Sequence, residues 1–136
     1  MGLFGKKKVT IPDGIRVCFY EGPLEGFEMN GPAQLLLQDE SIRITRVNPE
    51  VTVNLARERI TSVEHVMEKD YMGKYHGDAI STSKTNMPKW FLVIHFTSKA
   101  GIAEKLAFWS VGAETMKINK LVDELKNNIA PKSYDI

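Results

Sequence analysis

Cys18 is the only cysteine among the 136 residues of this sequence, so the chain cannot form an internal disulfide. Long apolar runs are also missing, and none approaches the roughly 20 residues that a membrane-spanning helix needs. Neither sign of charge is in excess, because 18 lysines and arginines balance 17 acidic residues. This balance disfavours nucleic-acid binding, which requires a positive surface. We expect a protein of the reducing cytoplasm, with the inner membrane surface as the alternative location.

Catalytic and metal-binding motifs are missing as well. A zinc site needs several cysteines or histidines at close spacing, whereas Cys18, His65, His76 and His95 are scattered along the chain. No Gly-x-Ser-x-Gly turn, dinucleotide fingerprint or phosphate-binding loop occurs in the sequence. We therefore predict a protein without a cofactor, a metal site or enzymatic activity.

Short alternations of apolar and polar residues, by contrast, are abundant, and they predict strands. Between residues 90 and 97, Trp90, Leu92, Ile94 and Phe96 share one face at period two, which indicates a half-buried strand. Other such segments are separated by short turns, which favours an antiparallel meander. These segments span residues 15–20, 33–38, 41–47, 51–55, 60–67 and 103–109.

The apolar spacing changes near the end of the chain, where it predicts an amphipathic helix over residues 113–129. Ile118, Leu121, Val122, Leu125 and Ile129 recur at three- and four-residue intervals and form one stripe. Short strands bury their apolar faces only if the sheet curls or splits into layers, and the helix then covers one open end. We therefore predict an α+β fold: a strongly bent antiparallel sheet or partly open barrel of about seven strands, capped by one C-terminal amphipathic helix.

One domain is expected, because a chain of 136 residues, 43% of them hydrophobic, has the length of one ordinary domain and enough apolar residues to form its core. It should span residues 14–130, between a basic flexible leader at 1–13 and a tail at 131–136. Its predicted core consists of apolar residues on the inward faces of the strands and the helix. These residues are Leu35, Leu37, Ile42, Ile44, Val53, Leu92, Ile94, Leu106, Phe108, Ile118, Leu121, Val122 and Leu125.

The alternation stops between residues 68 and 89, where glycine, serine, threonine and proline interrupt the pattern. We interpret this segment as a loop of about 20 residues, a length that is unusual in a compact domain unless the loop has a function. Its aromatic and basic residues make it a candidate partner-binding surface. These residues are Tyr71, Lys74, Tyr75, His76 and Lys84. The alternative is a solvated connection between two strands.

Several segments together resemble a known superfold. They are Glu21–Gly26, Ala33–Leu37 followed by Ser41–Thr45, Ile60–Val63, and Phe108-Trp109 before the helix. With this order of strands and a closing helix, the chain is similar to the pleckstrin-homology (PH) superfold, in particular to its small bacterial and GRAM-like members. The resemblance spans roughly residues 14–129. It implies a module that binds lipid headgroups, peptides or other subunits, and it implies no catalytic signature.

Phosphoinositide binding in PH domains depends on a lysine- and arginine-rich loop between the first two core strands. The corresponding residues in this sequence are Gln38, Asp39, Glu40 and Ser41. Two carboxylates at this position would repel phosphate groups. This departure from the family pattern argues against a specific headgroup site.

A different membrane contact is suggested by the start of the chain. Leu3 and Phe4 precede three lysines, Lys6, Lys7 and Lys8. Such a segment can insert its apolar side chains into an anionic bilayer, where each lysine contributes about 1 kcal/mol of attraction. The resulting membrane contact would be weak and sensitive to salt. The alternative is a disordered start that only aids solubility.

These observations predict a non-enzymatic binding or assembly module of the PH type. Its contact surface would be a sheet edge or the 68–89 loop, and its partner another protein or a second copy of the chain. The alternative is a peripheral module at the inner membrane surface, which would use the basic and apolar N-terminus. A small-molecule-binding protein or enzyme comes third, and it would require an enclosed pocket lined by convergent polar groups.

Overall fold

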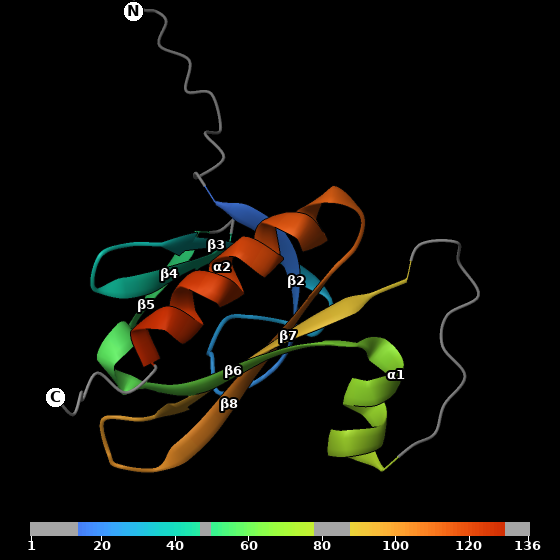
Figure 1. The fold of residues 1–136 in the computed structure, drawn as a ribbon. Helices are drawn as coiled ribbons and strands as arrows, with labels where there is room; N and C mark the ends of the chain where they lie inside the picture. The colour runs from blue at the N-terminus through green and yellow to red at the C-terminus, as the bar shows by residue number, and fades with distance from the viewer. Residues whose placement is uncertain (1–13, 47–49, 78–87, 130–136) are drawn as a thin grey trace, which may run out of the picture.

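The computed structural model describes residues 14–46, 50–77 and 88–129, and Figure 1 shows their arrangement. The predicted leader at 1–13 and tail at 131–136 lie outside the described residues. The described strands are β2 (Ile15–Glu21), β3 (Gly31–Leu37), β4 (Ser41–Arg46), β5 (Val51–Ala56), β6 (Ile60–Met67), β7 (Trp90–Thr97) and β8 (Ala103–Ser110). The described helical elements are the 3-10 helix η1 (Arg57–Arg59), α1 (Glu68–Tyr71), the π-helix η2 (Met72–His76) and α2 (Ala113–Ile129).

All seven described strands belong to one antiparallel sheet with the order β5-β4-β3-β2-β8-β7-β6. β2 lies at its centre and joins two meanders, because it pairs with β3 on one side and with β8 on the other. The register between β2 and β8 shifts between Phe19 and Glu21, and such bulges bend a strand. The two edge strands, β5 and β6, are neighbours in the chain and are joined by η1. The predicted α+β fold with a bent, partly open sheet is therefore confirmed.

The main core lies between α2 and the inner face of the bent sheet, which α2 crosses in Figure 1. The predicted helix bounds agree with α2, and Ile118, Leu121, Val122 and Leu125 of its predicted stripe are buried, whereas the side chain of Ile129 is not among those described. Every residue of the predicted core packs in or against this cluster, although Leu37 and Val53 are only partly buried. Burial of each large apolar side chain contributes about 1.5–3 kcal/mol to the free energy of folding.

A second, smaller core lies on the opposite face of the sheet. It contains Phe91 and Val93 of β7, Ala107 of β8 and Tyr71 of α1, each at most 1% exposed. Because successive strand residues point to opposite faces, β7 is buried on both sides. The prediction that β7 is only half-buried is therefore wrong. The alternation missed this because both faces of β7 are apolar.

The cover of this second face is a short helix, residues 68–76, that consists of α1 continued by η2; we call it the outer helix. The sequence analysis predicted a loop here, and the structure corrects that prediction for this part of the segment. Acidic residues in its first turn and basic residues in its last suit the helix dipole. Gly77 ends it with φ +68°, a left-handed conformation that glycine adopts without strain. Residues 78–87 lie outside the described residues.

A polar contact between α2 and β6 gives a first testable prediction. His65 Nδ1 donates a hydrogen bond to Asn119 Oδ1 over 2.7 Å, and the imidazole ring lies beside Trp90. We expect Asn119→Ala to lower the free energy of unfolding by about 1 kcal/mol, because a half-buried donor loses its acceptor. Urea unfolding should show this loss, while Lys120→Ala, an exposed position on the same helix, should change stability by less than about 0.5 kcal/mol. Equal effects of the two variants would contradict the prediction.

Candidate functional site

The outer helix is held to the sheet mainly by Tyr71. Its ring is fully buried and stacks on Phe91, with 4.5 Å between ring centroids and 10° between planes. Its hydroxyl donates a hydrogen bond to the carboxylate of Glu21 on β2. Tyr71 therefore belongs to the core of the fold. The prediction that it lies on a partner-binding loop is wrong, because the helix turns this side chain inward.

Glu21 is the centre of a first polar cluster under the outer helix. Besides the Tyr71 hydroxyl, its Oε2 contacts His76 Nε2 at 2.9 Å and Lys105 Nζ at 3.2 Å. Burial raises the pKa of Glu21, but hydrogen bonds from Tyr71, His76 and Lys105 outweigh burial and hold the pKa below its usual value. The carboxylate is thus ionised at neutral pH and connects three different elements of the fold.

Glu64 on β6 is the centre of a second cluster of the same composition. Its carboxylate contacts Lys74 Nζ at 2.8 Å and His95 Nε2 at 2.6 Å, and it accepts a hydrogen bond from the Tyr75 hydroxyl. Burial raises the pKa of Glu64, yet hydrogen bonds from Lys74, Tyr75 and His95 lower it to about 2. A carboxylate with such a low pKa is a weak base. This cluster is suited to fastening the outer helix and poorly suited to proton transfer.

The structure brings together four of the five residues predicted as a partner-binding loop. Tyr71, Lys74, Tyr75 and His76 all lie on the outer helix, where only Tyr71 is fully buried. Lys84 lies outside the described residues. So do the predicted membrane-contact residues Leu3, Phe4, Lys6, Lys7 and Lys8.

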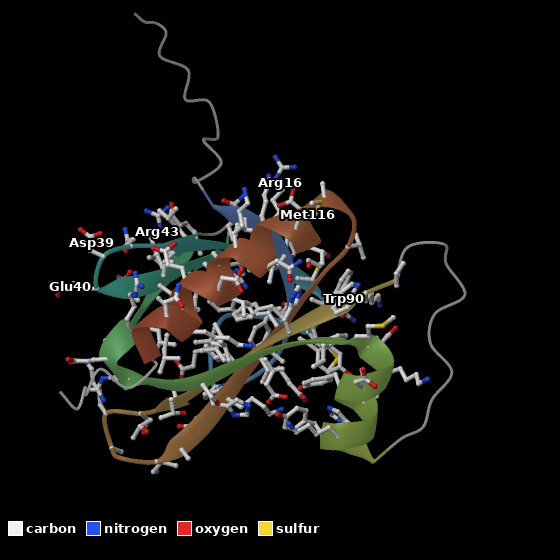
Figure 2. All side chains as sticks on the ribbon, viewed as in Figure 1. Arg16, Asp39, Glu40, Arg43, Trp90 and Met116 are labelled. Carbon is white, nitrogen blue, oxygen red and sulfur yellow. The ribbon has the colours of Figure 1, made fainter. Side chains whose placement is uncertain are left out.

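Asp39 and Glu40 lie at the tip of the β3–β4 hairpin, as Figure 2 shows, and both are exposed. The carboxylates that interrupt the expected phosphate-binding loop therefore face solvent. Among the described residues, no helix is long and apolar enough to cross a membrane. The same residues contain no group of three or more histidines, cysteines or acidic residues placed to hold a metal ion.

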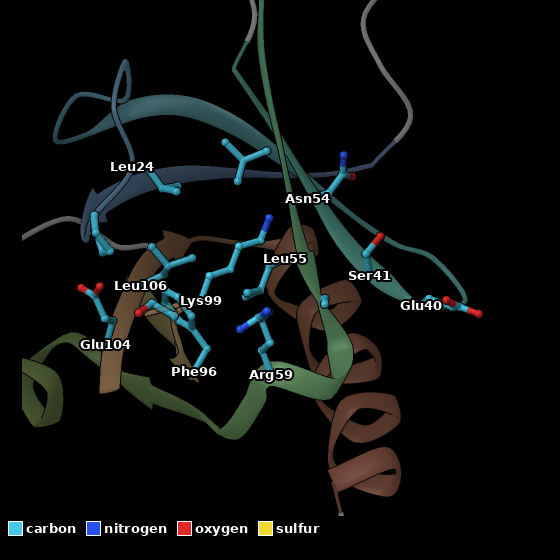
Figure 3. A pocket seen from close by; sticks show the side chains of 14 residues that line it. Leu24, Glu40, Ser41, Asn54, Leu55, Arg59, Phe96, Lys99, Glu104 and Leu106 are labelled. Carbon is cyan, nitrogen blue, oxygen red and sulfur yellow. The ribbon is translucent and has the colours of Figure 1, made fainter. Parts of the chain in front are cut away.

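A groove of about 580 Å³ lies at the open seam of the sheet (Figure 3). Its apolar walls are formed by Leu24, Leu55, Phe96 and Leu106, which come from the β2–β3 connection and from β5, β7 and β8. Four consecutive residues of β5, numbers 53–56, border it. We call this feature the seam groove. Sequence reasoning missed it, because its walls come from segments more than 80 residues apart and no local pattern marks them.

β5 presents unpaired backbone groups along the seam groove. Arg57 N donates a hydrogen bond to the carbonyl oxygen of Glu40 over 2.9 Å. In an antiparallel ladder, hydrogen-bonded pairs alternate with non-bonded pairs. Arg57 and Glu40 form a hydrogen-bonded pair, so the residues of β5 that lie one, three and five positions before Arg57 belong to non-bonded pairs. The backbone N–H and C=O groups of these residues, Ala56, Asn54 and Thr52, therefore point away from β4. Within the described part of the chain, no strand pairs with that side of β5.

Two cations, Arg59 and Lys99, line the seam groove. In Figure 3, Lys99 reaches across towards β5 and Arg59 points up from η1, whereas Glu40 and Glu104 point away at opposite rims. Neither cation forms an ion pair or hydrogen bond with another described residue. The seam groove thus combines apolar walls, an open strand edge and two unpaired positive charges.

Comparison of this chain with protein-family models, curated proteins and solved structures gives no match.

Proposed function

We propose that this chain is a non-enzymatic binding module with a PH-like architecture, and that it binds an extended segment of a partner protein along β5. The observation that carries this proposal is the open edge of β5 beside an apolar groove. An added strand would gain backbone hydrogen bonds from the edge and bury alternate side chains in the groove. The seven-strand meander with its closing helix supports the PH-like assignment.

A partner segment suits this site better than a second copy of the same edge does. In edge-to-edge pairing of two copies, the second β5 could not fill the groove, because Leu55 is buried in its own barrel and Val53 packs against the same core. A segment outside any sheet has both faces available. We therefore commit to an extended peptide from another protein, and treat self-association as an outcome of the test.

An enzymatic role receives less support from the same geometry. The seam groove is open and mainly apolar, and none of the described residues that line it is a histidine or a cysteine. The two clusters that do contain histidine have their carboxylates occupied by hydrogen-bond donors at the base of the outer helix. The described lining of the groove therefore offers no imidazole or thiol to act as a base or a nucleophile.

The proposal is tested by removing one outward backbone donor from β5. Asn54→Pro deletes an N–H that faces away from β4, so the ladder within the sheet stays intact. We expect this variant to bind a fluorescent peptide of alternating threonine and valine, with glutamate at its centre, about tenfold more weakly than the unmodified chain. Fluorescence anisotropy measures the affinity. Asn54→Ala is the matched control, since it keeps the N–H and should change binding less than about threefold.

Two outcomes would contradict the proposal. One is an unmodified chain that does not bind the peptide, and the other is equal binding by Asn54→Pro and Asn54→Ala. Light scattering on the same samples adds a third result. A dimer that Asn54→Pro converts to monomer would assign the β5 edge to self-association instead of partner binding.

A further inference from the structure

The two cations of the seam groove, which have no ionic partner among the described residues, suggest what kind of segment the groove selects. We infer that the groove prefers an extended peptide with an acidic side chain, placed between Arg59 and Lys99 and flanked by apolar side chains. This inference rests on the proposed function and adds the chemistry of the partner. The juxtaposition of both cations with the walls formed by Leu55 and Phe96 carries it.

Arg59 is held in place by the turn that carries it. Its neighbour Arg57 is anchored to the β3–β4 hairpin, because Arg57 N donates to Glu40 O and Arg57 Nη1 donates to Gln38 O over 2.7 Å. η1 is therefore tied to the hairpin, while the side chain of Arg59, a partly buried residue, points into the groove. A fixed backbone lowers the entropy that is lost when this side chain binds a ligand.

Lys99 lies on an equally well-defined turn between β7 and β8. Ser98 N donates to Ile102 O and Gly101 N donates to Ser98 O, each over 2.9 Å, and Ile102 N also donates to Ser98 Oγ. Gly101 has φ +82°, which glycine accepts readily. The stem of Lys99 thus starts from a fixed point at one wall of the groove, opposite β5.

An anionic group is the natural partner for this pair of cations. Filling the groove with apolar side chains would remove water from Arg59 and leave its charge uncompensated, which is unfavourable. A carboxylate between the two cations compensates their positive charge and accepts charge-assisted hydrogen bonds from them. Glu40 and Glu104 line the rims without reaching either cation, so this position is left for a ligand.

The test compares three peptides of about eight residues, a length that follows the whole β5 edge. All alternate threonine and valine, and their central residue is glutamate, glutamine or lysine. We expect the unmodified chain to bind the glutamate peptide about tenfold more tightly than the glutamine peptide at low salt, and this preference to shrink at high salt. The lysine peptide should bind most weakly. Fluorescence anisotropy measures all three affinities.

Charge reversal in the groove gives the decisive variant. Arg59→Glu combined with Lys99→Glu should invert the order, so that the lysine peptide binds more tightly than the glutamate peptide. Lys120→Glu, an exposed position on α2, is the control and should keep the original order. Circular dichroism verifies that all variants remain folded.

The outcomes separate this inference from the proposed function. If the unmodified chain binds the glutamate and glutamine peptides equally, the acidic preference is wrong and the peptide-binding function stands. If it binds none of the three peptides, both are wrong. Flotation with phosphatidylserine vesicles that is lost on charge reversal, without any peptide preference, would assign the two cations to a membrane surface and overturn the inference.

Discussion

Tyr71→Ala is expected to destabilise the protein by about 3–5 kcal/mol, the largest effect that we predict for a single substitution. Tyr71 is fully buried and stacks on Phe91, so truncation leaves a cavity between the outer helix and the sheet. The change also removes the hydroxyl that donates to Glu21 and accepts from Lys105 Nζ over 2.9 Å. Urea or thermal unfolding measures the loss.

A milder variant separates the packing of the Tyr71 ring from its hydrogen bonds. Tyr71→Phe keeps the stack on Phe91 and deletes only the hydroxyl, so it should cost about 1.5–3 kcal/mol, because the acceptor Glu21 is charged. Compared with the unmodified chain, amide hydrogen exchange in this variant should speed up more in the outer helix than in β7. A loss below about 1 kcal/mol for Tyr71→Ala would mean that the outer helix is not part of the cooperative fold.

The second large effect is an expected loss of stability at acid pH that depends on Glu64. Folding lowers the pKa of Glu64 from its ordinary value of 4.5 to about 2. A carboxyl group whose pKa is lowered by folding stabilises the folded state above its unfolded pKa, and this stabilisation is lost as the pH falls through the folded pKa. The free energy of unfolding should therefore decrease between about pH 5 and pH 2.

The expected contribution of Glu64 is about 2 kcal/mol at pH 7, smaller than the full pKa difference implies, because solvent screens part of the interaction. Glu21, whose pKa is also lowered, adds a loss of the same sign. Glu64→Gln removes the titrating group, so its deficit relative to the unmodified chain should be largest above pH 5 and shrink towards pH 2. Urea unfolding at several pH values measures this difference.

A matched control keeps the acid experiment specific to the carboxylate under the outer helix. Glu58→Gln alters an exposed glutamate on η1 and should leave the pH dependence unchanged. If Glu64→Gln shows a constant deficit at every pH, the effect would come from packing, and the described role of the charge would be wrong. If both variants show the same pH dependence, the loss of stability at acid pH would be caused by the net charge of the whole chain.

The strands and the long helix were predictable because their signals are local. Alternation at period two marks β3, β4 and β8, and apolar residues three and four apart mark α2 over its whole length. Each of these patterns depends on neighbours within one element. The predicted core followed from the same periodicities, and its members are buried or partly buried as expected.

The outer helix escaped prediction because it is short and carries little helical pattern of its own. What stabilises it is the contact of Tyr71 with Glu21 and Phe91, which lie 50 and 20 positions away in the chain. The burial of both faces of β7 was not predicted either, because a strand with two apolar faces also fits the pattern of a strand with one buried face. Aromatic residues in a supposed loop were a useful signal, although the role assigned to Tyr71 was wrong.

By itself, the amino-acid sequence determined the fold class of this protein: an α+β fold of short antiparallel strands closed by one amphipathic helix. Only the tertiary structure decided where its candidate sites lie. The curvature of the sheet brings β5 to the open seam beside the ends of β7 and β8, and places Arg59 and Lys99 in the lining of one groove. The physical reason is that residue patterns report burial within one element, whereas a groove depends on how separate elements meet in space.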